Sequence, residues 1–386
     1  TSLFGTKNKF APFWSAGIGW NVHNEKFMQS QNIVNNLRIR GSYGETGSQQ
    51  FASYQALSTF QSYTGKRYII WNGAELMGLG NEKLKWQVTK QLNGGVEVGL
   101  FDGRLSASFD IYSKKTSNLL SQMDLPLANG FSSYVDNVGE VKNTGYEAMI
   151  SGYLMRDTHR NIIWSMTAKL AYTKNEITKL SEAIKRQNEL YKSKDVEINQ
   201  LLYEGYAQNS IWAVPSMGID PSTGYEIFLD KNGNITDKWN PSDKRYFGVD
   251  EPKYRGNIST YFAWRDLSVN LSFAYQWGGQ QYNETLLNKV EVTNGEIDKN
   301  NVDSRVLKKR WQYIGDVKPY KGYGSVETKA TSRFVMDDNV FQFQSASVEY
   351  RLHSDFLRDK WKVETISIGA NMSDIFYISS IKRERG

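Results

Sequence analysis

Three histidines are the side chains of this sequence best suited to acid–base catalysis or to zinc binding, and they lie far apart. His23, His159 and His353 fall in three separate parts of the chain. A catalytic triad or a zinc site needs several such groups to converge on one point. The absence of cysteine also removes thiol nucleophiles, zinc–thiolate sites and disulfides. We therefore predict that the chain is not an enzyme and that it holds no metal.

One acidic segment, residues 230–237, superficially has the composition of a calcium-binding loop. Such a loop needs glycine at its sixth position and glutamate at its twelfth, where this sequence has Ile235 and Pro241. Asn232 and Gly233 instead favour a hairpin turn, since both tolerate the left-handed backbone of a tight turn. The sequence contains no nucleotide-binding glycine motif, so no cofactor is predicted.

The charge balance argues against a nucleic-acid partner. The chain carries 47 basic and 41 acidic residues, and its net charge of +6 is a mild excess for 386 residues. A nucleic-acid-binding protein usually concentrates its basic side chains on one face. The only compact basic run is Lys308, Lys309 and Arg310, and we interpret it as part of a solvated loop.

The elements that must position any functional group are strands. Between Trp86 and Ile111, apolar and polar residues alternate with a period of two, which predicts strand rather than helix. The alternation continues for longer than in a typical globular strand. It is interrupted by Asp102 and Gly103, which are a strong signal for a two-residue hairpin turn. We therefore expect two long strands joined by a tight turn.

The same design recurs and predicts about ten long strands in all. Two early strands and this first hairpin are followed by three more hairpins, at 146–172, 258–275 and 340–376. Long polar connections separate the hairpins, near 46–85, 117–143, 175–255 and 278–338. Tight turns at one end and long loops at the other are typical of outer-membrane barrels.

The composition agrees with strands that cross a membrane. Mean hydropathy is −0.57, because a barrel strand alternates lipid-facing and lumen-facing side chains. Hydrocarbon offers no partners to backbone polar groups, so a spanning sheet must close. Aromatic residues near the strand ends predict an interfacial belt: Trp14, Trp20, Trp86, Trp164, Trp264, Tyr275 and Trp277. The alternative is a large soluble β protein whose apolar faces pack as a core.

Aromatic residues in the long connections are the candidates for ligand contact. Their faces can stack on sugar rings or pack against apolar side chains of a peptide. The predicted substrate-binding residues are Trp71, Trp212, Trp277, Tyr282, Trp311 and Tyr313. The alternatives are packing within the loops and contact with a partner subunit. One connection also contains an amphipathic stretch, Leu180–Leu202, which predicts a short helix.

Several of these strands match the sequence pattern of a known family. The matching segments, in chain order, are FAPFWSAGIGWNVHNEKFM, LRIRGSYGETGSQ, LKWQVTKQLNGGVEVGLFDGRLSASFDIYSKKTSNLL, NVGEVKNTGYEAMISG, EGYAQNSIWAVPSMGIDPSTGYEIFLDKNG, FAYQWGGQQYN and the late pair NVFQFQSASVEYRL and ISIGANMSDIF. Together they resemble the SusC/RagA family of TonB-linked outer-membrane proteins. Each segment is weak alone, but the match follows nearly the whole chain in order.

The resemblance implies an all-β fold, a transmembrane antiparallel β-barrel of roughly 22 strands. Residues 1–386 would form its C-terminal half, with the long loops on the extracellular side. A leader, a TonB box and an N-terminal plug, which is not in this chain, are expected before Thr1, and a final strand is expected after Gly386. Charged residues facing the lumen are then candidates for contact with the plug: Arg38, Arg40, Glu97 and Lys169.

The function that the resemblance implies is TonB-dependent nutrient import across the outer membrane of a Gram-negative bacterium of the Bacteroidetes type. The implied partners are a SusD-like surface lipoprotein, TonB acting through the upstream part, membrane lipid and lipopolysaccharide. The implied substrate is a glycan oligomer or a peptide. Two alternatives stay open: a passive outer-membrane channel, and a surface adhesin or assembly protein.

Overall fold

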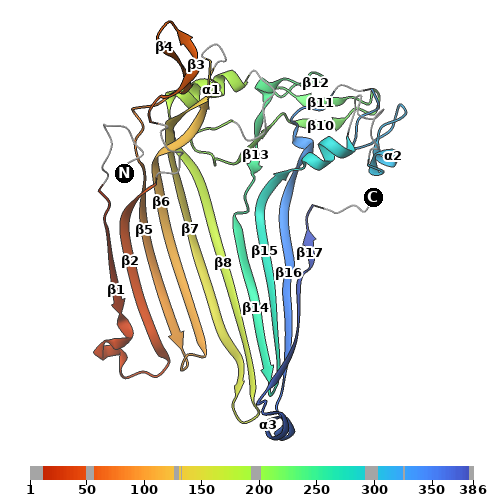
Figure 1. The fold of residues 1–386 in the computed structure, drawn as a ribbon. Helices are drawn as coiled ribbons and strands as arrows, with labels where there is room; N and C mark the ends of the chain where they lie inside the picture. The colour runs from red at the N-terminus through yellow and green to blue at the C-terminus, as the bar shows by residue number, and fades with distance from the viewer. Residues whose placement is uncertain are drawn as a thin grey trace.

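A computed structural model describes residues 12–48, 56–125, 130–131, 133–192, 201–291, 303–324 and 327–381 of the chain. Its main element is one antiparallel sheet of ten strands, in the order β1-β2-β5-β6-β7-β8-β14-β15-β16-β17 (Figure 1). Their bounds are β1 (Ser15–Asn21), β2 (Val34–Ser48), β5 (Gln87–Leu100), β6 (Leu105–Asp124), β7 (Ser133–Asp157), β8 (Ile162–Leu180), β14 (Tyr254–Trp264), β15 (Leu267–Tyr282), β16 (Val335–Leu352) and β17 (Ile366–Ser379).

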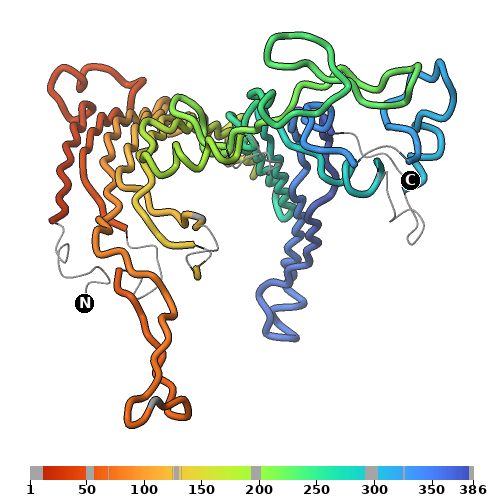
Figure 2. The backbone as a smooth tube through the Cα atoms, turned by 90° about the horizontal axis from the view of Figure 1, so that it is seen from above, coloured from red at the N-terminus to blue at the C-terminus, as the bar shows by residue number. Residues whose placement is uncertain are grey.

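The sheet is curved but not closed. Viewed from above, it forms an open wall (Figure 2). Strands β1 and β17 are its two edges, and within the described residues they pair only with β2 and β16, respectively. The prediction of about ten long antiparallel strands is confirmed.

The tight turns lie together at one end of the wall (Figure 1). Asp102 and Gly103 both have positive φ, 54° and 74°, as predicted for the centre of the turn. The loop is longer than the two residues predicted, because the last strand pair is Leu100 with Leu105 and Phe101 also has positive φ. Asn161 and Arg265 also have positive φ in the two turns that follow. The last connection differs, because a helix, α3 (Asp355–Trp361), stands between β16 and β17.

The strands extend further into the predicted connections than the sequence pattern indicates. Strand β6 continues to Asp124 and β7 begins at Ser133, so most of the range 117–143 is paired sheet. Strand β8 likewise continues to Leu180. In these extensions polar residues occur on both faces, so apolar and polar residues no longer alternate along the strand. The backbone pairing nevertheless continues.

A layer of smaller elements covers the other end of the wall (Figure 1). It contains α1 (Glu182–Lys192), which confirms the helix predicted within Leu180–Leu202. Its other elements are β3 (Thr59–Tyr68), β4 (Trp71–Gly78), β9 (Ser210–Ala213), β10 (Ser216–Ile219), β11 (Glu226–Leu229), β12 (Ile235–Thr236), β13 (Arg245–Val249) and α2 (Arg305–Lys309). No helix in the described ranges is both long enough and apolar enough to cross a bilayer.

The buried apolar core lies in this layer and at the adjoining ends of the sheet strands. One cluster joins the upper ends of β6, β7 and β8 to α1, through residues such as Met123, Val141 and Ile177. A second joins Tyr282 to Phe334 and its neighbours. The apolar side chains of the wall below contribute no comparable core among the described residues. The wall therefore does not resemble the packed core of a soluble β protein.

Candidate functional site

One face of the wall is apolar and exposed. Ile18 is 78% exposed, Ile111 53% and Ile368 60%, and they lie on strands at both edges and in between. Large aliphatic side chains spread over a broad surface are unfavourable in water and favourable against hydrocarbon. The hydroxyl of Thr260 on this face has a local partner, since its Oγ1 donates to the Ser165 carbonyl, 3.1 Å away. This face is suited to lipid.

Aromatic rings cross the apolar face in a row near the loop end. The ring centroids of Tyr146 and Tyr172 lie 5.0 Å apart, those of Tyr172 and Tyr254 5.0 Å, and those of Tyr254 and Trp277 5.5 Å. Each residue comes from the next strand of the sheet, from β7 to β15. Rings with an apolar body and a polar tip favour the membrane–water boundary.

The height of the apolar face matches a bilayer. On β14, Tyr254 lies in this row and Trp264 lies at the turn end of the same face. Ten strand residues rise about 34 Å, and a tilt of about 40° reduces this to about 26 Å across the membrane. The apolar band of an outer-membrane barrel is about 25 Å tall. Tyr254 and Trp264 therefore lie at the spacing expected of two interfacial belts.

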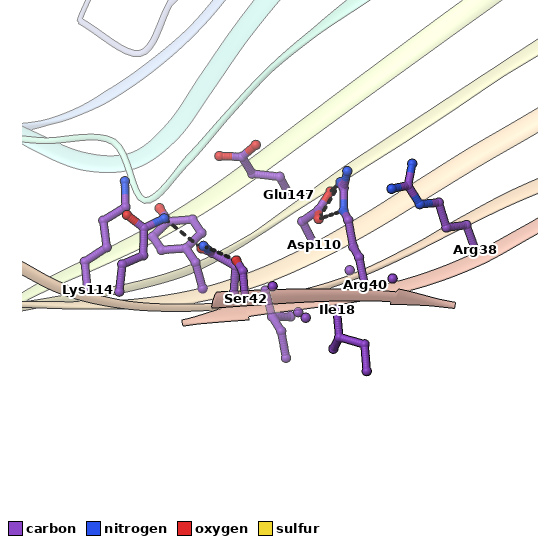
Figure 3. A pocket seen from close by; sticks show the side chains of 16 residues that line it. Ile18, Arg38, Arg40, Ser42, Asp110, Lys114 and Glu147 are labelled. Carbon is purple, nitrogen blue, oxygen red and sulfur yellow. Dashed lines mark hydrogen bonds and ion pairs between the residues drawn. The ribbon is translucent and has the colours of Figure 1, made fainter. Parts of the chain in front are cut away.

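The opposite, concave face is polar and contains an open cavity of about 710 Å³. Figure 3 shows Arg38, Arg40, Asp110 and Glu147 on this side, whereas Ile18 points the other way. Arg40 pairs with two acids from two other strands, since Nη1 lies 2.8 Å from Glu97 Oε1 and Nη2 lies 2.7 Å from Asp110 Oδ1. The prediction that Arg38, Arg40 and Glu97 share the polar face is consistent with this geometry.

Glycines inside three strands let side chains cross over them. Gly95 of β5 lies between Arg40 and Asp110, and a Cβ there would meet Asp110 Oδ1 at 2.2 Å. Gly145 of β7 lies under Tyr112, whose hydroxyl is 3.0 Å from Thr173 Oγ1 on β8.

The third crossing lies on the apolar face. Gly256 of β14 lies under Tyr275, whose hydroxyl donates to the Lys169 carbonyl at 2.7 Å. Each of the three contacts therefore joins two strands that are not neighbours in the sheet.

Several charges on the concave face have no ion-pair partner within the described ranges. Arg38 and Glu147 line the cavity without a salt bridge. Lys114 lines it too, with its ammonium 5.3 Å from the centre of the Tyr112 ring. Charged side chains of this kind, facing water, suit a surface that contacts a polar surface of another domain or a polar solute.

The loop layer is held by a buried cluster of charges. Arg333, just before β16, pairs with Glu226 of β11, with Nη2 2.9 Å from Oε2, and also with Glu291. The Glu226 and Glu291 side chains are 1% and 0% exposed. Thr331 donates to Glu226 Oε1 at 2.7 Å, and the Lys321 ammonium lies 3.7 Å from Glu226 Oε2. Two loops distant in sequence are therefore fixed to the start of one barrel strand.

The pKa values in this cluster follow from burial and pairing. Burial alone would raise the pKa of Glu226, but hydrogen bonds and charge from Arg333 outweigh it and lower that pKa. Burial also opposes the charge of Arg333, whose pKa the two glutamates nevertheless raise. Burial lowers the pKa of Lys321, and Glu226 offsets only part of that change. At neutral pH the Glu226–Arg333 pair is therefore ionised.

Three of the six predicted substrate-binding residues are packed inside the loop layer. Trp212 is 8% exposed, its ring centroid is 4.6 Å from that of Tyr203, and its indole nitrogen is buried with no acceptor in the described part of the chain. Tyr282 is 8% exposed and packs against Phe334. Trp311 is half-buried and donates to the Pro221 carbonyl at 2.9 Å.

The other three occupy different surroundings. Trp71 is 71% exposed beside the tip of the β3–β4 hairpin, and Tyr313 is 73% exposed in the loop after α2. Trp277 is on β15, in the aromatic row of the apolar face, rather than in a loop. The structure does not bring the six together, and ligand contact stays a prediction for each of them.

The remaining sequence candidates are turns and isolated side chains. Asp230 accepts from the backbone N–H of Asn232 and of Asn234, and β11 pairs with β12 around Gly233, so the predicted hairpin turn is confirmed. His23 contacts the backbone of Leu37. Nowhere in the described ranges do three or more histidine or acidic side chains gather as metal ligands would.

Sequence reasoning missed the Glu226–Arg333 cluster and the crossings over glycine. The glutamates and the arginine come from separate loops, and nothing in their spacing indicates that they meet. The crossings had a usable signal, because a glycine inside a strand often marks a close approach of other atoms. Gly95, Gly145 and Gly256 each stand within an alternating pattern.

The chain matches the family model described as "TonB dependent receptor-like, beta-barrel" over residues 1–371. It is 29% identical over 387 residues to TonB-dependent receptor P3 of Formosa agariphila, covering 92% of this chain and 36% of that protein. It is 24% identical over 320 residues to TonB-dependent receptor SusC of Bacteroides thetaiotaomicron, covering 79% of this chain and 31% of that one.

Among solved structures, the chain is similar in fold to one described as the RagAB peptide transporter. The TM-score is 0.82 at 23% identity, covering 98% of this chain and 41% of the other. The chain therefore spans only about a third of the length of these curated relatives, P3 and SusC.

Proposed function

Because this chain belongs to the TonB-dependent receptor-like β-barrel family, whose members are outer-membrane transporters rather than enzymes, we propose that it forms wall and loops of an energised nutrient importer. The observation that carries the proposal is the two-faced wall. Its apolar face is about 26 Å tall between Tyr254 and Trp264, and its other face is polar and lined by Arg38, Arg40 and Glu147. Such a wall separates lipid from an aqueous lumen.

In this proposal the tight turns face the periplasm and the loop layer faces the cell exterior. Outer-membrane barrels have short periplasmic turns and longer extracellular loops, and this chain has the same asymmetry between its two ends. The rest of the barrel and a plug would come from parts of the full-length protein outside this chain. Charges on the concave face, such as Arg38, Lys114 and Glu147, would face that plug or the passing solute.

The substrate is a glycan oligomer or a peptide, and a SusD-like lipoprotein captures it above the loops. Support comes from the relatives, one named SusC and one described as part of a RagAB peptide transporter. The loop layer adds a surface suited to such a partner, because the Glu226–Arg333 cluster fixes its loops while Trp71 and Tyr313 remain exposed. TonB would act through the part of the importer outside this chain.

The test is uptake and growth on a panel of glycan oligomers and peptides after deletion of the full-length gene. We expect a defect on one substrate class, restored by the full-length gene and abolished again when TonB is removed. Normal uptake of every substrate in the deletion strain, with intact membranes, would contradict import. Uptake that survives loss of TonB would identify a passive channel instead.

A further inference from the structure

Helix α3 is well formed although its side chains are mostly exposed among the described residues. Ser354 caps its start by accepting from the Phe356 N–H at 3.2 Å, and Lys362 ends it in the left-handed conformation with φ 56°. None of its residues is buried. An isolated helix of seven residues is unstable in water and needs tertiary contacts on its apolar side. Some surface outside the described chain must therefore cover α3.

The side that needs covering is aromatic. Phe356 is 56% exposed and Trp361 is 59% exposed, and their ring centroids are 6.1 Å apart. Phe356, Leu357 and Trp361 fall on one side of a helix together with Lys360, whereas Asp355, Arg358 and Asp359 fall on the other. Asp355 and Arg358 pair with each other at 2.7 Å. The helix is thus amphipathic along its short length.

The position of α3 continues the apolar face of the wall. It follows Leu352 of β16 and precedes Ile368 of β17, which are 38% and 60% exposed on that face. Tyr350 lies at the level of Trp264, because both pair with Leu267. The helix therefore begins just past the belt at the turn end (Figure 1). A headgroup layer lies about 5–7 Å beyond the hydrocarbon on each side, and α3 follows the strand ends on this side.

We infer that α3 lies on the phospholipid headgroup layer at the turn end of the barrel and anchors that edge of the wall in it. Phe356 and Trp361 insert between headgroup and acyl chain, as aromatic residues of interfacial helices do. This inference rests on the proposed function, since it requires the wall to span a membrane, and it assigns a lipid contact to an element outside the spanning band.

The basic residues of α3 fit an anionic surface. Arg358 pairs with Asp355 and Asp359, and with Lys360 and the C-cap residue Lys362 the three basic and two acidic residues of 354–362 give a net charge of +1. The Lys360 ammonium lies 5.2 Å from the centre of the Phe356 ring. A cation held beside an inserted aromatic ring is placed at the level of the lipid phosphates. The lysines therefore meet phosphate groups while the rings enter the apolar layer.

The test uses nitroxide labels on the full-length importer in nanodiscs of phosphatidylethanolamine and phosphatidylglycerol. This chain has no cysteine, so Phe356→Cys and Trp361→Cys can be labelled singly once any cysteine elsewhere in the full-length protein is replaced. We expect their collision with a water-soluble nickel relaxant to be at least threefold lower than that of a label at Asp355→Cys. Equal access at all three positions would overturn the inference.

A label at Ile368→Cys separates this outcome from failure of the proposed function. If Ile368 is shielded but Phe356 and Trp361 are open to water, the wall spans the bilayer and only the role of α3 is wrong. If Ile368 is also open to water, the spanning wall itself is wrong. Replacing Lys360 and Lys362 with glutamine should reduce the shielding of the Phe356 label at least twofold, and unchanged shielding would overturn the assignment of the two lysines to lipid phosphates.

Discussion

Arg40 and Asp110 form an ion pair across an intervening strand, with Arg40 Nη2 2.7 Å from Asp110 Oδ1 above Gly95. Arg40 is on β2, Gly95 on β5 and Asp110 on β6. The pair exists only because residue 95 has no side chain, since a Cβ there would lie 2.7 Å from Arg40 Nε as well. A glycine in the middle of a strand, which normally weakens a sheet, here permits a contact that its neighbours cannot make.

The substitution Gly95→Ala should therefore destabilise the wall by about 1–3 kcal/mol, as overpacking of a close contact does. Gly94→Ala is the matched control, because a Cβ at Gly94 meets only Ile111 Cγ1, at 3.7 Å. The control should change stability by less than about 0.5 kcal/mol. The measurement is the temperature at which the folded full-length barrel unfolds on semi-native gels. An equal decrease in that temperature for both variants would contradict the contact of Arg40 with Asp110 over Gly95.

Replacing Arg333 with methionine should loosen the loop layer while leaving the wall intact. The change leaves Glu226 and Glu291 buried without their shared partner, and breaking a buried pair in this way costs about 3–5 kcal/mol. Hydrogen exchange of residues 210–229 and 327–334 should accelerate, whereas exchange in the strands of the wall should not.

The control for that variant is Lys174→Met, which removes an exposed pair with Glu176 at 2.8 Å. Exposed pairs contribute about 0–1 kcal/mol, so its exchange should remain close to that of the unaltered protein. A faster exchange in Lys174→Met than in Arg333→Met would show that the buried cluster does not hold the loops.

The same cluster predicts an acid dependence. The pKa of Glu226 is lowered in the folded protein, so its contribution to stability is present above the unfolded pKa of about 4.3 and is lost as pH falls through the folded value. The loop layer should therefore open below about pH 4, before the wall unfolds. Tryptophan fluorescence during heating at pH 7, 5 and 3 measures this. The Glu226→Gln variant should lose part of the pH dependence, and an unchanged profile would assign the effect to other groups.

Gly224 and Gly233 offer a paired test of the role of Trp311. Both have left-handed backbones, with φ 73° and 87°, but a Cβ at Gly224 would meet the Trp311 ring at 2.4 Å and one at Gly233 would meet nothing. Gly233→Ala should cost about 1 kcal/mol from the backbone alone. Gly224→Ala should cost about 1–3 kcal/mol more, seen as faster hydrogen exchange at 309–322. Equal effects would mean that Trp311 does not pack on the turn.

The wall could be predicted from the sequence because lipid and water impose a period of two on each strand. In β14 and β15, most alternate residues from Tyr254 to Trp277 are apolar or aromatic, with Gly256 and Thr260 as exceptions, and Arg265 with Asp266 marks the turn between them. Beyond the aromatic row that constraint ends. The upper part of β7, from Ser133 to Asn143, pairs with β6 through two register shifts, and its apolar and polar residues no longer alternate strictly.

The loop layer could not be predicted for a different reason. Glu226 and Arg333 are 107 residues apart and meet only through the folded chain. Trp212 and Trp311 are predicted to contact a ligand because they are aromatic residues in polar loops. In the structure Trp212 is buried and Trp311 packs on the Gly224 turn. The spacing of residues in a loop does not distinguish an aromatic ring that packs inside the loop from one that binds a ligand, because both occur in polar, irregular sequence.

The contact of Tyr112 with Thr173 over Gly145, like that of Tyr275 with Lys169 over Gly256, has a mechanical consequence. A strand that slips along its neighbour keeps its faces only if it moves by two residues. Here slippage of β7 would also have to break the bond that connects the strands on either side of it. Each of these bonds connects two strands across a third. A force that slides one strand along its neighbour is therefore opposed by three strands rather than two.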